Sequence, residues 1–186
     1  MEDCLITLRD ATSDDAPALA AIYGDACLNG FGTFEEEAPS PAEMARRLAE
    51  VQQMGLPYLV AESDGAVVGL CYAKPFRPRS AYRYTVENSV YVLPSAKGLG
   101  VGRLMLAALI ERCEAMDLRQ MVAVIGDSLN TGSIALHETL GFAHTGLFRA
   151  VGYKLGRWVD IVFMQRALNG GDASHPQGVG QTLREY

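Results

Sequence analysis

Residues 85–110 read TVENSVYVLPSAKGLGVGRLMLAALI, an extended run followed by a glycine-rich turn and an amphipathic helix. Alternation along 85–93 places three valines on one face and Glu87, Ser89 and Tyr91 on the other, which predicts a strand. Pro94 lacks a backbone N–H, so the strand ends there. Apolar residues spaced along 104–110 predict a helix that packs on the core. The chain is therefore expected to fold around a strand, a turn and a helix.

The glycine turn indicates a site for an anion. Glycines at 98, 100 and 102 come just ahead of a helix start, where backbone N–H groups are free and the helix dipole favours negative charge. Lys97 and Arg103 add positive charge on either side. The spacing is neither the dinucleotide fingerprint nor a Walker A loop. A phosphate is the expected ligand, although a plain strand-to-helix connection would also fit the turn.

Composition limits the classes of partner. The length of 186 residues argues for one domain. The net charge of −6 and the pI near 5.1 argue against nucleic acid or an anionic membrane as a partner. Four cysteines show no metal-ligand spacing, so no metal and no disulfide is expected. No leader or membrane-spanning run is seen, and a cytoplasmic location with reduced thiols is predicted. We expect one domain over 1–168 and a mobile, glycine-rich tail over 169–186.

The remaining elements follow from periodicity and turn residues. Strands are predicted at 5–8, 58–63, 66–73, 121–125, 142–148 and 158–168; helices are predicted from the caps at 12–15 to about 29, from 40 to 54, from the glycine turn to about 117, and from 130 to just before 141. Residues 74–80 and 149–157 are predicted to be loops.

Two loops are candidates for substrate contact. Residues 31–35 place Phe34 beside the carboxylate of Glu35, which fits either plain packing or one wall of a substrate pocket. The loop 74–80 carries two prolines and three basic residues, Arg77 and Arg79 among them. It is either a solvated basic loop or an anion site for substrate.

One helix presents three polar residues on the same face. Asn130, Ser133 and His137 stand at i, i+3 and i+7. A lone histidine on a helix is usually a structural residue, so this spacing alone does not make His137 catalytic.

Several motifs together resemble the GNAT superfamily of N-acetyltransferases. Lys97-Gly98-Leu99-Gly100-Val101-Gly102 after Val92-Leu93-Pro94 resembles its acyl-CoA loop, Gln/Arg-x-x-Gly-x-Gly/Ala, with Lys97 at the first position. The segment N-x-x-S-x-x-x-H-x-x-x-G-F at 130–142 resembles the superfamily pattern with histidine in place of tyrosine. Histidine is expected there in the phosphinothricin and methionine sulfoximine acetyltransferase branch. The resemblance to that branch is nearly continuous over 6–168, including TVENSVYV (85–92), VAVIG (122–126), LHETLGF (136–142) and GYKLGRWVD (152–160).

The resemblance implies an α+β fold of α/β/α-like GNAT type, with a mixed, mostly antiparallel sheet of about seven strands and about four helices. It implies acetyl-CoA as co-substrate, transfer of acetyl to the α-amino group of an amino-acid-like substrate, and a homodimer. Glu87 is the candidate base, and His137 either protonates the departing thiolate or shares the base role. The candidate acetyl-CoA contacts are Val90, Tyr91, Val92, Lys97, Gly98, Leu99, Gly100, Val101, Gly102, Arg103, Asn130 and Ser133. The candidate substrate contacts are Phe34, Glu35, Arg77, Arg79, Tyr82 and Glu87.

Two alternatives remain at this level. The acceptor could be a peptide N-terminus, a polyamine or an aminoglycoside, although the latter two cations would want an acidic pocket rather than Arg77 and Arg79. A non-catalytic acyl-CoA sensor should lack a carboxylate at position 87, and this chain keeps Glu87.

Overall fold

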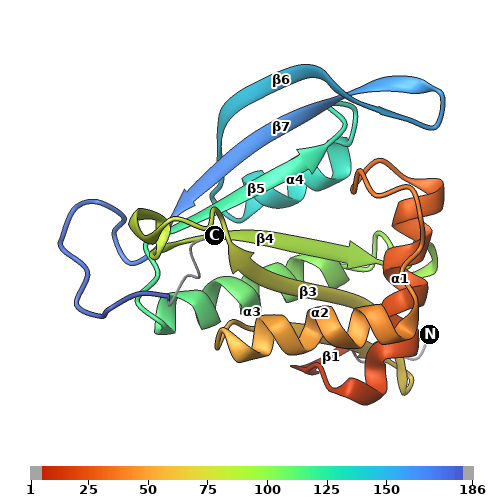
Figure 1. The fold of residues 1–186 in the computed structure, drawn as a ribbon, viewed down its shortest axis with the longest axis horizontal. Coiled ribbons are helices and arrows are strands. Elements are labelled where there is room, and N and C mark those ends of the chain that lie inside the picture. Colours follow the sequence, from red (N-terminus) through yellow and green to blue (C-terminus); the bar gives the residue numbers. More distant parts are fainter. Residues whose placement is uncertain (1–5, 182–186) are drawn as a thin grey trace.

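The computed structural model describes residues 6–181, which form one mixed sheet with helices on both faces (Figure 1). The elements in chain order are β1 (Ile6–Asp10), α1 (Ala16–Asn29), α2 (Pro41–Gln53), β2 (Tyr58–Ser63), β3 (Ala66–Pro75), β4 (Thr85–Val92), α3 (Val101–Ala115), β5 (Gln120–Gly126), α4 (Thr131–Thr139), β6 (Ala143–Lys154) and β7 (Arg157–Ala167), with 3₁₀ turns at Ser13–Asp15, Ser80–Tyr82 and Pro94–Ala96.

The sheet order is β1-β2-β3-β4-β5-β7-β6, and every neighbouring pair is antiparallel except β4 and β5. Seven strands and four α-helices within the described residues confirm the predicted α+β fold and its mostly antiparallel sheet. No helix within 6–181 combines the length and apolar character needed to cross a membrane.

The helices start where the sequence supplies their caps. At the start of α2, Ser40 precedes Pro41 and its Oγ accepts a hydrogen bond from the Glu43 N–H. At the start of α4, Asn130 Oδ1 accepts a hydrogen bond from the Ser133 N–H. The N-cap of α3 is instead Gly100, whose φ of 81° lies in the left-handed region. The glycine turn and its helix therefore lie where the sequence predicted them.

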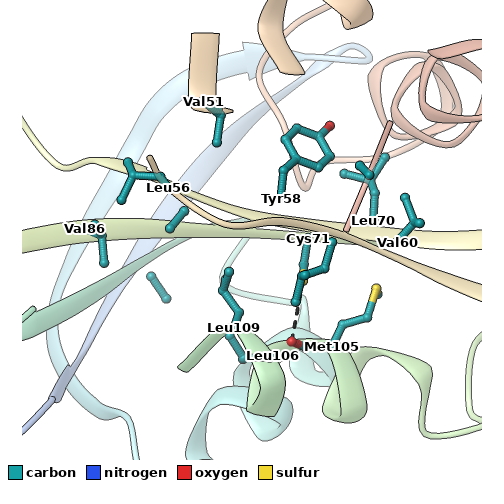
Figure 2. Close-up of a cluster of buried hydrophobic side chains, with 14 of the residues drawn as sticks. Val51, Leu56, Tyr58, Val60, Leu70, Cys71, Val86, Met105, Leu106 and Leu109 are labelled. Atoms are coloured by element: carbon teal, nitrogen blue, oxygen red, sulfur yellow. Dashed lines mark hydrogen bonds between the residues drawn. The ribbon is translucent and has the colours of Figure 1, made fainter. Parts of the chain in front are cut away.

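The core fills both sides of the first four strands. Figure 2 shows Val51 of α2 and Tyr58 on one side of the strands, and Met105, Leu106 and Leu109 of α3 on the other. The last three side chains are fully buried. Burial of the α3 stripe anchors the glycine turn against the sheet.

The chain after β5 departs from two sequence predictions. The predicted loop over residues 149–157 is wrong, because β6 continues to Lys154 and a two-residue turn leads into β7. A register shift between Phe148 and Gly152, with Ala150 at φ 51°, breaks the alternation that marks a strand. The loop predicted from residue 74 also begins too early, since Lys74 and Pro75 still pair with Glu87 and Val86.

Residues 169–181 run back along the end of α3 and the start of β4. Arg119 donates to the carbonyl oxygens of Gly171 and Ser174, and Gln181 N donates to Arg83 O. The Tyr84 hydroxyl donates to Gly178 O. The domain boundary at residue 168 and the mobility of this segment stay predictions. The predicted strand start at Leu5 and the predicted reduced thiol of Cys4 lie outside the described residues.

Candidate active site

The site lies where β4 and β5 part. The two strands pair in parallel from Thr85 with Gln120 to Asn88 with Ala123, and no pair follows. Leu93 N donates to Val68 O on β3. Because successive peptide groups of a strand point to alternate edges, the N–H groups of Val90 and Val92 point to the other edge, where β5 has diverged. Beyond residue 88 the strand therefore presents free backbone donors to the opening.

A cleft of about 1050 Å³ occupies this opening and reaches the glycine turn. Gly98 and Gly100 have φ near 80°, and a Cβ on either would meet no protein atom within 4 Å. The first N–H groups of α3 have no helical carbonyl partner, so they are available to a ligand. The turn is thus an open cradle of backbone donors at a helix N-terminus, suited to the pyrophosphate of a nucleotide cofactor.

Glu87 opens into the same cleft. Its side chain is 14% exposed, and its Oε1 lies 3.0 Å from Lys74 Nζ on the paired strand β3. The ion pair orients the carboxylate at the lip of the cleft. Glu87 and the glycine turn therefore border one continuous space.

His137 lines the inner wall and is 3% exposed. Its Nδ1 lies 2.7 Å from Ser133 O, its Nε2 lies 3.0 Å from Asn88 Oδ1, and its ring packs edge-on against Phe142. Burial lowers the pKa of His137, and the contact with the Ser133 carbonyl opposes that shift. Asn88 also donates a hydrogen bond to Val122 O, so it connects His137 to the end of the β4–β5 pairing.

The loop between α1 and α2 forms a further wall. Phe34 and Glu35 both line the cleft. The Glu35 carboxylate accepts from Arg47 and from the Tyr23 hydroxyl, 2.8 Å away. Contact with Arg47 lowers the pKa of Glu35 against the effect of burial. Glu35 is thus fixed as an ionised part of the wall.

Most of the residues singled out from the sequence meet around this cleft. Those that line it are Phe34, Glu35, Glu87, Val90, Tyr91, Val92, Lys97, Gly98, Gly100, Val101, Gly102, Arg103, Asn130, Ser133 and His137. Leu99 points to solvent and is 61% exposed. Arg77 and Arg79 do not line the cleft; Arg77 stacks on the Phe76 ring at 4.3 Å. Tyr82 lies beside Phe76 in a second groove of about 340 Å³ on the open face of β5 and β7.

The sequence analysis assigned no role to Lys74, Asn88, Tyr23 or Lys154. The sequence prediction put Lys74 in a loop, whereas extending the strand predicted at 66–73 by one residue sets it opposite Glu87. Asn88 contacts His137 and Tyr23 contacts Glu35, which lie 49 and 12 residues away in the sequence. No local sequence pattern therefore indicates their roles. Within residues 6–181 no cluster of three histidine, cysteine or acidic side chains could hold a metal ion.

Comparisons with known proteins agree with this geometry. A family model described as an acetyltransferase (GNAT) domain matches residues 8–163. Phosphinothricin N-acetyltransferase of Alcaligenes faecalis is 51% identical over 174 residues, which cover 94% of this chain and 88% of that protein. L-methionine sulfoximine/L-methionine sulfone acetyltransferase of Pseudomonas aeruginosa is 42% identical, covering 88% of this chain and 95% of its own.

A crystal structure of a GNAT superfamily phosphinothricin acetyltransferase from Sinorhizobium meliloti, in complex with acetyl-CoA, has the same fold. Its TM-score is 0.90 and its identity 48%, with 92% of this chain and 93% of that chain covered.

Proposed function

This chain belongs to the acetyltransferase (GNAT) domain family, and from that premise we propose that Glu87 is the base with which it acetylates amino acids. The enzyme transfers the acetyl group of acetyl-CoA to the α-amino group of a small amino-acid-like substrate of the phosphinothricin, methionine sulfoximine or methionine sulfone type. One observation carries the assignment of Glu87: it lines the same cleft as the glycine turn.

The residues divide the chemistry between the two ends of the cleft. The glycine turn and the free N–H groups of Val90 and Val92 hold the cofactor's pyrophosphate and thioester arm. An α-amino group is largely protonated at neutral pH, so Glu87 must take its proton, directly or through water, before the nitrogen attacks the thioester carbon. The C–S bond then breaks, and the second proton that the nitrogen loses goes to the departing thiolate. We assign His137, whose two ring nitrogens contact Ser133 O and Asn88 Oδ1, the orienting role at this end of the cleft.

Acceptor choice is assigned to the basic loop after β3. Arg77 and Arg79 do not line the cleft, but Arg77 stacks on Phe76, which lines the second groove. A guanidinium can donate two N–H bonds to a carboxylate or phosphinate, which favours zwitterions over plain amines. Arg77→Gln or Arg79→Gln should raise the amino-acid KM at least about tenfold and leave the acetyl-CoA KM unchanged. Equal rates on a substrate and its methyl ester would refute this assignment.

The test of the proposed function is a thiol-release assay with acetyl-CoA. The acceptors are methionine sulfoximine, methionine sulfone, phosphinothricin, the protein amino acids, a short peptide and a polyamine. We expect the highest kcat/KM among the first three. A higher value for the peptide or the polyamine would replace the amino-acid assignment.

We also propose that the enzyme is a homodimer that uses the β6–β7 face. Six apolar or aromatic side chains of this hairpin are 41–64% exposed: Leu147, Phe148, Val151, Tyr153, Leu155 and Trp158. β6 is also an edge strand, and Figure 1 shows no helix in front of the pair. Exposed apolar patches beside a free strand edge are typical of interfaces between proteins.

Trp158→Glu tests the dimer, because Trp158 is the most exposed of these apolar side chains and a charge there should abolish association. Sedimentation velocity should report a dimer for the wild type and a monomer for the variant. Val179→Glu, at an 88% exposed position outside the patch, is the matched control and should stay dimeric. A wild-type monomer at micromolar concentration would exclude the proposal.

A cytoplasmic location is proposed on the basis of acetyl-CoA use and of the cysteine chemistry. Cys27, Cys71 and Cys113 are free and buried, and burial raises the pKa of each thiol. Such thiols are typical of a reducing compartment.

A further inference from the structure

We propose that Lys154 is a positioning residue for the acetyl acceptor: its buried ammonium fastens the loop Gly30–Glu35 to the β6–β7 hairpin. The inference rests on the proposed function in that this loop is taken as the acceptor-side wall. The loop follows α1, which packs on β3 and β4, and it contacts β5 and β6 on the far side of the fork between β4 and β5. Its position therefore sets the width of the cleft beside Glu87.

The lysine is unusual in its surroundings. Its side chain is 2% exposed, and Nζ donates to Thr33 O at 2.8 Å and to Ala26 O at 3.2 Å. Among residues 6–181 no carboxylate lies within ion-pair distance of it. Burial lowers the pKa of Lys154, while Cys27, Glu36 and Glu35 oppose the shift. A buried ammonium that is bonded to backbone carbonyls of α1 and the loop holds the backbone itself, whatever side chains the loop carries.

Three further contacts join the loop to the same strands. A Cβ on Gly152 would lie 2.1 Å from the Phe34 ring, so the ring rests directly on the β6 backbone. A Cβ on Gly126 would lie 1.9 Å from Phe31 O, so β5 touches the loop in the same way. Arg157 stacks on the Phe31 ring at 3.9 Å while it pairs with Asp127.

These contacts form a latch, defined as Lys154 with the carbonyls of Ala26 and Thr33 and the contact of the Phe34 ring with Gly152. At its other end the loop is held by Glu35 through Tyr23 and Arg47. Because Glu35 fixes one end of the loop to α1 and α2, the latch at the other end determines the position of the Phe34 ring in the cleft. The latch lies apart from the glycine turn, so its loss should disturb the acceptor and spare the cofactor.

The test compares Lys154→Met, which keeps an unbranched chain and removes both bonds, with Arg46→Met at an exposed position on α2. Hydrogen exchange of the ligand-free protein should show amides 30–35 exchanging at least about tenfold faster in Lys154→Met, with β4 unchanged. The amino-acid KM should rise about tenfold, with kcat within about threefold and acetyl-CoA affinity unchanged. Arg46→Met should match wild type in all of these.

A second variant tests the latch with Lys154 in place. Gly152→Ala pushes the Phe34 ring from its seat and should raise the amino-acid KM without lowering acetyl-CoA affinity. Unchanged exchange at 30–35 in Lys154→Met, or unchanged KM in both variants, overturns the inference. If no amino acid is acetylated by wild type, the proposed function fails while the exchange experiment still decides whether the latch exists.

Discussion

At the scale of single residues, the ion pair of Glu87 with Lys74 places a carboxylate at the lip of the cleft that the glycine turn also lines. Such a group can meet an incoming ammonium without moving the strand that carries it. General-base catalysis typically contributes about 10²- to 10⁴-fold to a rate.

Glu87→Gln is therefore expected to lower kcat by about 10²-fold or more while acetyl-CoA affinity stays the same. Steady-state kinetics across pH and calorimetric titration with acetyl-CoA measure the two quantities. Glu62→Gln is the matched control, because Glu62 is also a strand carboxylate in an ion pair, with Arg9, and it lies outside the cleft. Wild-type kcat in Glu87→Gln at every pH would remove this residue from the mechanism.

His137 connects the site to stability. Burial lowers its folded-state pKa, so the unfolded chain binds a proton more readily than the folded one. Its contribution is fully present above the unfolded-state pKa, about 6.5, and is lost as the pH falls toward and below that value. The free energy of unfolding should fall by up to about 1.4 kcal/mol per pH unit from this group alone.

Urea denaturation at intervals between pH 7 and pH 5 measures this dependence. His137→Phe should show a shallower slope than wild type, since the other titrating groups are common to both. Parallel slopes would mean that the histidine is equally easy to protonate in both states.

At the scale of elements, the glycine turn works through backbone conformation. Gly100 combines φ 81° with open space in front of its Cα, so any side chain there is strained and also intrudes on a bound phosphate. Gly65, in the β2–β3 turn, has φ 77° and equally open surroundings, and it lies away from the cleft.

Gly100→Ala should weaken acetyl-CoA binding at least about tenfold, roughly 1.4 kcal/mol by calorimetry. Gly65→Ala carries the same backbone strain and should lower the melting temperature without changing the affinity. A change within about twofold in Gly100→Ala would show that the turn does not cradle the cofactor.

Elements were predictable from the sequence where one local signal sufficed. The strand at 85–92, the glycine turn and the capped helices needed only alternation, positive-φ glycines and Ser or Asn caps. The β6 bulge was missed because Ala150 and Gly152 interrupt the alternation while the strand continues. The roles of Asn88, Tyr23 and Lys154 were missed because each depends on a partner 10 to 128 residues away.

At the scale of the whole molecule, the sheet consists of two parts joined along β4 and β5. Four residue pairs make this junction, against seven between β3 and β4 and seven between β5 and β7. The cofactor turn belongs to the first part, whereas Asn130 and Ser133 belong to the second. A ligand in the cleft therefore touches both parts and strengthens their association.

That short junction also suggests a way to divide the chain. A cut in the turn at Asp117, between α3 and β5, leaves β1–β4 with α1–α3 in one fragment and β5–β7 with α4 in the other. The fragments would share the four-pair junction, the latch and the walls of one cleft. Fused to the halves of a split fluorescent reporter, they would reassemble in proportion to acetyl-CoA and turn the fold into a sensor of that metabolite.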